Sequence, residues 1–474
     1  MVSLLISGIH IGRMATAGLL SCFLLMAGCS TLSTQRGFYK PITAELEKEN
    51  YDGAVAAMEK ARQEDKFAGK DRFLYYIDAG LLYHYAVSYD SSNARLNAAE
   101  QAADELYARS LSRAAASLLL NDNVLEYAGE DYEILYSNLI KTLNYLELGK
   151  FEDAFVEVRR ANEKLNLLEQ KYRDMANKYE QAKETDSIKV DIKYEAREVR
   201  FNNDAFARYL SMHMYAAEGK FDDARIDRDY LGAAFAEQPH IYDFPEPDVR
   251  FVPEDKNKTI LSVIGLAGLA PVKEPLNLRL RTDKNLDLVQ ILYTNPWRKN
   301  TEYGHIPMKI SEDYYFKFAI PVIVRRASNI SRIRVLADGV FIGELQLLED
   351  VAAVAGETFE AKRFLIYLRT VARAVAKGLI THRQKEKVDD GKAGGWLAKL
   401  AIDAVTDISE NADLRSAQYL PGKIYVGDFE MAPGKYDLTI EFINPEGHVL
   451  GFKNIDDYIV SKTTLNMVEA RLLK

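Results

Sequence analysis

Residues 239–258 read PHIYDFPEPDVRFVPEDKNK and separate two unlike halves of the chain. Four prolines lie within fifteen positions of this stretch, at 239, 245, 247 and 253. Proline removes a backbone donor and breaks helices, so a helix cannot continue here. Apolar residues recur at helical spacing before the stretch and alternate with polar residues after it. We therefore predict an α+β fold of two domains, a helical domain at 29–238 and a β-rich domain at 259–474, with 239–258 as linker.

The composition is that of a globular protein and excludes several classes. The chain has 474 residues, 48% of them hydrophobic, which allows two or three domains with their own cores. Lys and Arg number 61 against 70 Asp and Glu, a formal charge of −9 that argues against nucleic acid as a partner. Two cysteines support neither a disulfide-rich scaffold nor a cysteine-based metal site.

The first half contains four segments with a shared pattern. In each, an aromatic residue follows a turn, a small residue stands three positions later, and a small or apolar residue stands seven positions after that. The four sets are Tyr51/Ala54/Ala61, Tyr89/Ser92/Ala99, Phe151/Ala154/Ala161 and Phe221/Ala224/Leu231. This pattern resembles tetratricopeptide repeats, although the spacings of 38, 62 and 70 residues are irregular. The prediction is a tetratricopeptide-like solenoid, with generic helical hairpins as the alternative.

The third segment continues into a heptad pattern. Its apolar positions step alternately by three and four, at Leu165, Leu168, Tyr172, Met175 and Tyr179. Residues 184–187 break this run, and apolar residues at 188, 192 and 199 follow. We predict an antiparallel helical arm over about 162–200, whose return helix packs on the outgoing one. The alternative is that the apolar face of this helix binds another protein.

The second half alternates like a sheet and carries helical inserts. Strands are predicted around 276–281, 332–335, 424–426, 436–442 and 449–452, with a type I′ hairpin turn at Asp338-Gly339. Helices are predicted near 350–380 and 396–408. This half is therefore expected to be an antiparallel β domain with inserted helices.

An apolar run at residues 14–28 follows Arg13 and ends in Leu-Met-Ala-Gly-Cys at 25–29. The run suits a signal peptide and is too short to span a bilayer. Its end resembles the lipobox of bacterial lipoproteins, which implies that residues 1–28 are removed and that the Cys29 thiol receives diacylglycerol. Ser30 stands where an Asp would imply retention in the inner membrane, so the outer membrane is expected. The alternative is an ordinary cleaved signal peptide, with Cys29 not acylated.

Further segments extend this resemblance over most of the mature chain. Together with the lipobox and the repeats, they resemble an uncharacterised family of bacterial tetratricopeptide-like outer-membrane lipoproteins, which implies architecture and anchoring but no activity. Ala417 stands where that family usually has Trp. The segments are Glu126–Glu133, Val156–Arg160, Gly268–Glu274, Arg369–Arg373, Ala412–Arg415 and Leu420-Pro421.

Asp131, Glu133, Arg159 and Arg160 form a candidate polar cluster around the third repeat. An inward-facing Arg could bind the C-terminal carboxylate of a partner protein through two hydrogen bonds. It could equally fasten the loop before the repeat to the repeat's second helix, because a buried Arg requires a carboxylate partner.

Arg369, Arg373 and Lys377 are four residues apart and share one helix face. Such a face could bind an anionic glycan, a phospholipid headgroup or an acidic protein. The alternative is that these side chains extend to solvent or pair with neighbouring carboxylates.

No pattern for catalysis, cofactor or metal is present. The six histidines of the mature chain include no two within twenty residues, which excludes helical zinc motifs. The nucleophile elbow, the phosphate-binding loop and the dinucleotide-binding glycine motif are also absent. We therefore expect a protein that is not an enzyme and holds no cofactor or metal.

The expected function is a scaffold or adaptor for envelope proteins, in a setting such as cell-envelope assembly. Acylated Cys29 would anchor it in the bilayer of the outer membrane, facing the periplasm. One alternative is a glycan- or lipid-binding module that uses Arg369, Arg373 and Lys377. Another is an envelope carbohydrate hydrolase with a carboxylate site.

Overall fold

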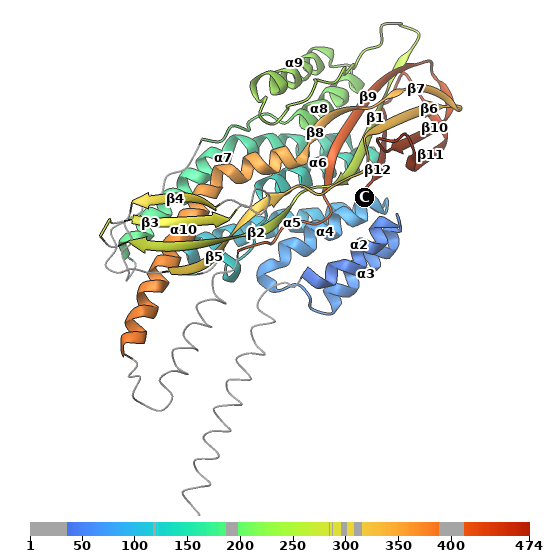
Figure 1. Ribbon diagram of the computed structural model, residues 1–474. Helices are drawn as coiled ribbons and strands as arrows, with labels where there is room; N and C mark the ends of the chain where they lie inside the picture. Colours follow the sequence, from blue (N-terminus) through green and yellow to red (C-terminus); the bar gives the residue numbers. More distant parts are fainter. Residues whose placement is uncertain are drawn as a thin grey trace, which may run out of the picture.

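The computed structural model describes residues 36–116, 120, 122–185, 198–283, 285–286, 288–294, 301–307, 315–387 and 412–474. Helices and strands both contribute extensively, which confirms the α+β class (Figure 1). The predicted lipobox with Cys29 and the predicted helix at 396–408 lie outside the described residues.

Eight helices form four consecutive hairpins, and each predicted aromatic residue is the first residue of a second helix. The pairs are α2 (Tyr39–Glu47) with α3 (Tyr51–Gln63), α4 (Arg72–Tyr85) with α5 (Tyr89–Ala116), α6 (Asp131–Glu147) with α7 (Phe151–Thr185), and α8 (Ala205–Ala217) with α9 (Phe221–Glu237). Two positions before each aromatic the backbone has positive φ, at Glu49 (61°), Val87 (60°), Gly149 (67°) and Gly219 (75°). This left-handed residue ends the first helix and reverses the chain.

The small residues of the pattern lie at helix crossings. Ala54, Ser92, Ala154 and Ala224 are fully buried. The Ser92 hydroxyl donates to the carbonyl of Gly80 over 2.7 Å, which joins α4 and α5 where they cross. The helical hairpins are thus confirmed, while a tetratricopeptide superhelix remains a prediction.

Gly80 is expected to be required for this approach. A Cβ built on Gly80 would lie 2.5 Å from Cδ2 of Leu96, so Gly80→Ala should lower the free energy of unfolding by about 1–3 kcal/mol. Gly356→Ala is the matched control, because no atom lies within 4 Å of its added Cβ. That change should be neutral or stabilise by up to about 1 kcal/mol. Urea unfolding measures both, and equal effects would contradict the close packing at Gly80.

Within the described part of the chain, twelve strands form three four-stranded sheets. The first has the order β12-β1-β9-β8, the second β11-β10-β6-β7 and the third β4-β3-β2-β5. In chain order the strands are β1 (Thr259–Leu269), β2 (Val272–Asp283), β3 (Leu288–Thr294), β4 (Thr301–Pro307), β5 (Tyr315–Val324), β6 (Arg332–Ala337), β7 (Val340–Glu344), β8 (Gln346–Asp350), β9 (Pro421–Met431), β10 (Gly434–Ile443), β11 (Val449–Val460) and β12 (Asn466–Leu472). The predicted strand segments are confirmed, and Asp338 and Gly339 both have positive φ, as a type I′ turn requires.

The prediction of a purely antiparallel domain is wrong at one pair. β12 pairs parallel with β1, from Leu261 opposite Asn466 to Ala267 opposite Leu472. The preceding strand β11 belongs to the second sheet, so the chain crosses between sheets before β12. β12 therefore runs in the same direction as β1. Two strands joined directly by a hairpin would run in opposite directions.

The first sheet is the middle layer of the molecule. Leu261 and Val263 of β1 share a core with side chains of the second sheet, whereas Ile264 and Leu266 belong to the core formed by the helices. The helical core therefore extends beyond residues 239–258, which contain neither helix nor strand. The predicted division into a helical domain and a β-rich domain at this stretch stays a prediction.

The inserted helix near 350–380 is confirmed as α10 (Val351–Lys387) and lies beside α7 (Figure 1). One residue of the heptad seam of α7 contacts α10, because the Tyr172 hydroxyl donates to the Thr358 carbonyl over 3.1 Å. Most of the return segment of the predicted arm over 162–200 lies outside the described residues, so the arm stays a prediction. α7 ends at Thr185, residues 198–200 are not helical, and positions 188 and 192 lie outside the described residues. No described helix is long and apolar enough to cross a membrane.

Candidate functional site

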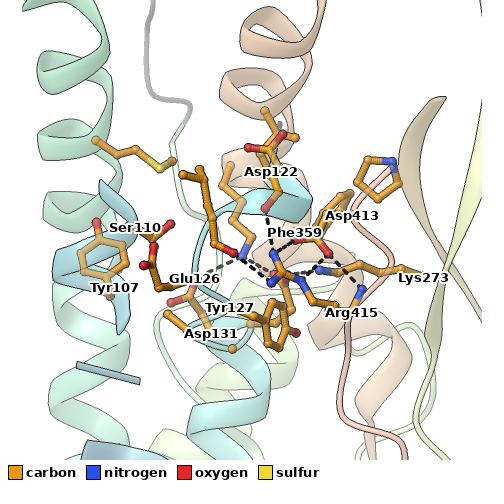
Figure 2. A pocket seen from close by; sticks show the side chains of 18 of the residues that line it. Tyr107, Ser110, Asp122, Glu126, Tyr127, Asp131, Lys273, Phe359, Asp413 and Arg415 are labelled. Carbon is orange, nitrogen blue, oxygen red and sulfur yellow. Dashed lines mark hydrogen bonds and ion pairs between the residues drawn. The ribbon is translucent and has the colours of Figure 1, made fainter. Parts of the chain in front are cut away.

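A cavity of about 150 Å³ lies where α5, α6, α7, α10, β2 and the segment 412–420 meet (Figure 2). Four segments that carry the family resemblance line it, namely those at 126–133, 268–274, 369–373 and 412–415. They are far apart in the chain and meet through charged side chains. We call the charged side chains through which these segments meet the charged junction. Its members are Asp71, Asp122, Glu130, Asp131, Glu133, Lys273, Lys362, Arg369, Arg373, Asp413 and Arg415.

Arg415 uses all five of its N–H donors. Nε and Nη2 donate to the two carboxylate oxygens of Asp413, each over 2.8 Å, and Nη1 donates to Asp71. The remaining two donors reach the carbonyls of Leu125 (3.0 Å) and Asp122 (2.8 Å). Burial by itself would raise the pKa of Asp413, but Arg415 holds that pKa well below its usual range. Arg415 thereby joins the segment 412–420 to the start of α4 and to the loop before α6.

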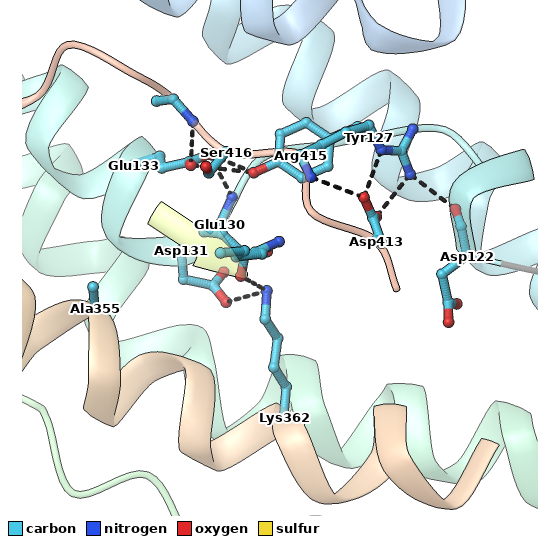
Figure 3. Close-up of polar contacts among 12 residues, drawn as sticks. Asp122, Tyr127, Glu130, Asp131, Glu133, Ala355, Lys362, Asp413, Arg415 and Ser416 are labelled. Carbon is cyan, nitrogen blue, oxygen red and sulfur yellow. Dashed lines mark hydrogen bonds and ion pairs between the residues drawn. The ribbon is translucent and has the colours of Figure 1, made fainter. Parts of the chain in front are cut away.

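The N-terminus of α6 presents two buried carboxylates to three lysines. Lys362 from α10 binds Glu130, as Figure 3 shows. Lys273 from β2 also binds Glu130, whereas Lys171 from α7 binds Asp131 over 2.5 Å. Burial opposes ionisation, yet the lysines lower the pKa of Asp131 to about 2 and also lower that of Glu130. The helix dipole favours anions at this end as well. Helices and sheet are therefore linked through one cluster.

Two further buried carboxyls bind the backbone of the segment 412–420. The amide of Ala417 donates to Glu133 over 2.7 Å, and the amide of Gln418 donates to Asp78 over 2.7 Å. Glu133 also accepts from the Tyr127 hydroxyl at 2.9 Å. Burial raises the pKa of both Glu133 and Asp78 to about 7.

Arg369 and Arg373 do not form an accessible anion-binding face, so that prediction is corrected. They are 1% and 2% exposed and pair with Asp122, while both donate to the carbonyl of Leu120. Spacing by four places residues on one helix face but leaves open whether that face points inward. Here it points at the helical layer, and the predicted alternative of carboxylate pairing holds for both arginines. The side chain of Lys377 lies outside the described part.

Arg159 and Arg160 are not joined to Asp131 and Glu133, which corrects the predicted cluster. Arg160 pairs with Glu157 (3.0 Å) and Glu100 (3.6 Å), and Arg159 is exposed. α6 and α7 form an antiparallel hairpin with its turn at Gly149, so Asp131 lies opposite residues near 167–172 of α7. Lys171 consequently takes the place predicted for the arginines. This hairpin geometry was the signal in the sequence that could have identified Lys171.

A second constellation does not have the geometry of a catalytic triad. Ser262, His213 and Asp428 come together where β1 and β9 meet α8, and His213 Nε2 lies 3.1 Å from Asp428. The Ser262 hydroxyl, however, lies 3.2 and 3.3 Å from the two ring nitrogens. An atom nearly equidistant from both cannot lie along the N–H direction of either, as proton transfer requires. Among the described residues, no group of three or more potential ligands is placed to hold a metal ion.

No protein-family model matches the chain, and no curated protein is significantly similar to it.

Proposed function

We propose that the protein is a lipid-anchored, non-enzymatic scaffold of the bacterial outer membrane, facing the periplasm, whose tetratricopeptide-like hairpins bind an envelope protein. The lipobox resemblance supports the anchor, and the four hairpins support the binding surface. The predicted division into a solenoid and a β-rich domain belongs to this proposal. Most charges of the charged junction are paired with one another, as expected of groups that hold a structure together.

The observation that carries the proposal is the outer face of α9, the last helix of the row. Ile226 and Tyr230 are four residues apart on it and are 46% and 50% exposed. In repeat proteins the equivalent face of an internal helix is covered by the next repeat. The Arg208 guanidinium lies 4.6 Å from the centre of the Tyr230 ring, and about half of each side chain stays exposed. This exposed apolar pair at the end of the row is therefore a surface suited to a partner helix.

Anchoring is tested by Cys29→Ser. Each buried methylene contributes about 0.8 kcal/mol to membrane binding, so acyl chains on one thiol hold a protein firmly. The wild-type protein should fractionate with outer membranes, and the Ser variant should be retained elsewhere as an unacylated precursor. Mass spectrometry of the wild type should find the lipid on Cys29. An unmodified sulfur, or unchanged fractionation of the variant, would contradict the anchor.

Partner binding is tested by crosslinking in living cells. A photoreactive residue at Tyr230 should form one dominant adduct with an envelope protein, and Ile226→Asp should abolish it. The matched control places the photoreactive residue at Lys435, an exposed position in β10, and should give no adduct. Equal adducts at both positions, or none at Tyr230, would contradict a scaffold that uses α9.

A further inference from the structure

We propose that Asp204 and Glu349 share a single proton, and that loss of this proton at higher pH releases the start of α8 from the first sheet. We call these two residues the carboxyl pair. The pair acts independently of the lipid anchor and of partner binding by α9, so the proposal can fail without either of them.

Both carboxyl groups lie at the N-terminus of α8, where they accept from neighbouring backbone amides. Asp204 is the N-cap residue and accepts from the Ala207 amide over 2.7 Å. Glu349 reaches the same turn from β8, the edge strand of the first sheet, and accepts from the Phe206 amide over 3.3 Å. Amides of consecutive residues are adjacent, so the two carboxyl groups lie side by side. The pair therefore forms part of the contact between α8 and β8 (Figure 1).

Each member of the pair has one oxygen that no donor reaches. Asp204 and Glu349 are both fully buried. Within the part of the chain that the structure describes, Oδ2 of Asp204 and Oε1 of Glu349 have no hydrogen-bond partner. Two adjacent buried carboxylates would each lack compensation and would repel each other. A proton on one carboxyl turns it into a donor to the other, which removes the second charge and engages the free oxygens.

Two tyrosines face the pair and leave it without a positive charge. The Tyr242 hydroxyl donates to Oε2 of Glu349 over 3.3 Å. The hydroxyl of Tyr136, on α6, is buried and has no partner among the described residues. Burial first, and then the charges of Glu349 and Asp204, raise the pKa of Tyr136. Both tyrosines therefore stay neutral and can only donate hydrogen bonds to the pair.

Two charged groups also face the pair, and they do not compensate a second negative charge. Burial raises the pKa of Asp204, and Arg208 on α8 offsets only part of that rise because its guanidinium also binds Asp227 over 3.0 Å. Burial and then the charge of Asp204 raise the pKa of Glu349, and the neighbouring Asp350 raises it further. The helix dipole and Arg208 thus favour one negative charge at this position, and the second carboxyl remains protonated.

The direction of the pH dependence follows from the shared proton. Between the ordinary pKa of an exposed carboxyl and the raised pKa of the pair, the closed structure holds a proton that it loses when the start of α8 opens to water. Closure therefore takes up a proton, and the fraction of open molecules rises with pH. For one proton this fraction rises by at most about tenfold per pH unit.

Hydrogen exchange of the full chain at about pH 6 and about pH 8, followed by mass spectrometry, tests this release. After correction for intrinsic rates, the start of α8 should open at least about tenfold more often at the higher pH in the wild type. Glu349→Gln mimics the protonated acid, because its amide can donate to Asp204 and its carbonyl can accept from Phe206. This variant should lose most of the pH dependence. Asp204→Asn should do the same, since asparagine is also a good N-cap.

Infrared difference spectra detect the proton itself. At about pH 7 the wild type should show the carbonyl stretch of one more protonated carboxyl group than Glu349→Gln does. Glu133 and Asp78 cancel in this difference because both proteins contain them. Asp222→Asn, in the exposed first turn of α9, is the matched control and should change neither measurement.

Three results would each overturn the proposal. The first is equal opening of α8 in the wild type at both pH values. The second is a pH dependence in the folded Glu349→Gln or Asp204→Asn variant as steep as in the wild type. The third is a difference spectrum without a protonated carboxyl. Circular dichroism shows which variants are folded, and either one suffices for the test.

Discussion

Replacement of Arg415 by alanine is expected to lower the free energy of unfolding by about 3–5 kcal/mol, because removing one partner of a buried ion pair leaves the other charge uncompensated. The side chain of Arg415 is 8% exposed, and it is hydrogen-bonded to two carboxylates and two carbonyls. Its loss leaves Asp413 without its guanidinium and takes a partner from the fully buried Asp71. Denaturant unfolding of the full chain measures the effect.

Arg332→Ala is the matched control for this prediction. Arg332 pairs with Glu344 over 3.5 Å and is half exposed, so its loss should cost no more than about 1 kcal/mol. If Arg415→Ala had an effect as small as that of Arg332→Ala, the charged junction would not hold the segment 412–420 in place.

Stability is expected to fall as pH rises from about 5 to 8, and Glu133→Gln should flatten this dependence. The pKa of Glu133 is about 7 in the folded chain, raised first by burial and then by Glu130. Between the unfolded pKa of about 4.5 and this value, the folded state keeps a proton that the unfolded state has lost. The unfolded state therefore binds fewer protons, and the free energy of unfolding decreases with pH. A shift of this size corresponds to about 3 kcal/mol across the window.

Urea unfolding at several pH values measures the slope. Asp78, whose pKa is also raised to about 7, should maintain part of it in the Glu133 variant. Glu446→Gln, in the exposed turn between β10 and β11, is the control and should leave the slope unchanged. A slope in Glu133→Gln as steep as in the wild type would show that Glu133 is already ionised at neutral pH.

The local features of the fold were predictable from the sequence because they depend on neighbouring residues. An aromatic after a turn and a small residue three positions later marked all four hairpins, and Asp338-Gly339 marked its β-turn. The parallel placement of β12 depends on which sheet the preceding strand joins. That choice is made by packing between distant segments, and alternation of apolar residues does not encode it.

The candidate site was predictable only in part. Asp131 and Glu133 were identified, and the segments around Lys273 and Arg415 were noted for their resemblance. Spacing alone did not show that Arg369 and Arg373 face inward. Nor could it show that Lys362 reaches the start of α6. These contacts join residues more than 200 positions apart, and no helical or strand period spans that distance.

We expect the shared core and the charged junction to unite the helical and β-rich halves into one cooperative unit. Native-state hydrogen exchange of the full chain, followed by mass spectrometry at increasing low denaturant, tests it most directly. The slowest amides of α6 and of β10 should exchange through the same opening, with equal free energy and equal denaturant dependence. If β10 kept its protection where α6 had lost it, or the reverse, the halves would unfold separately and the claim would be wrong.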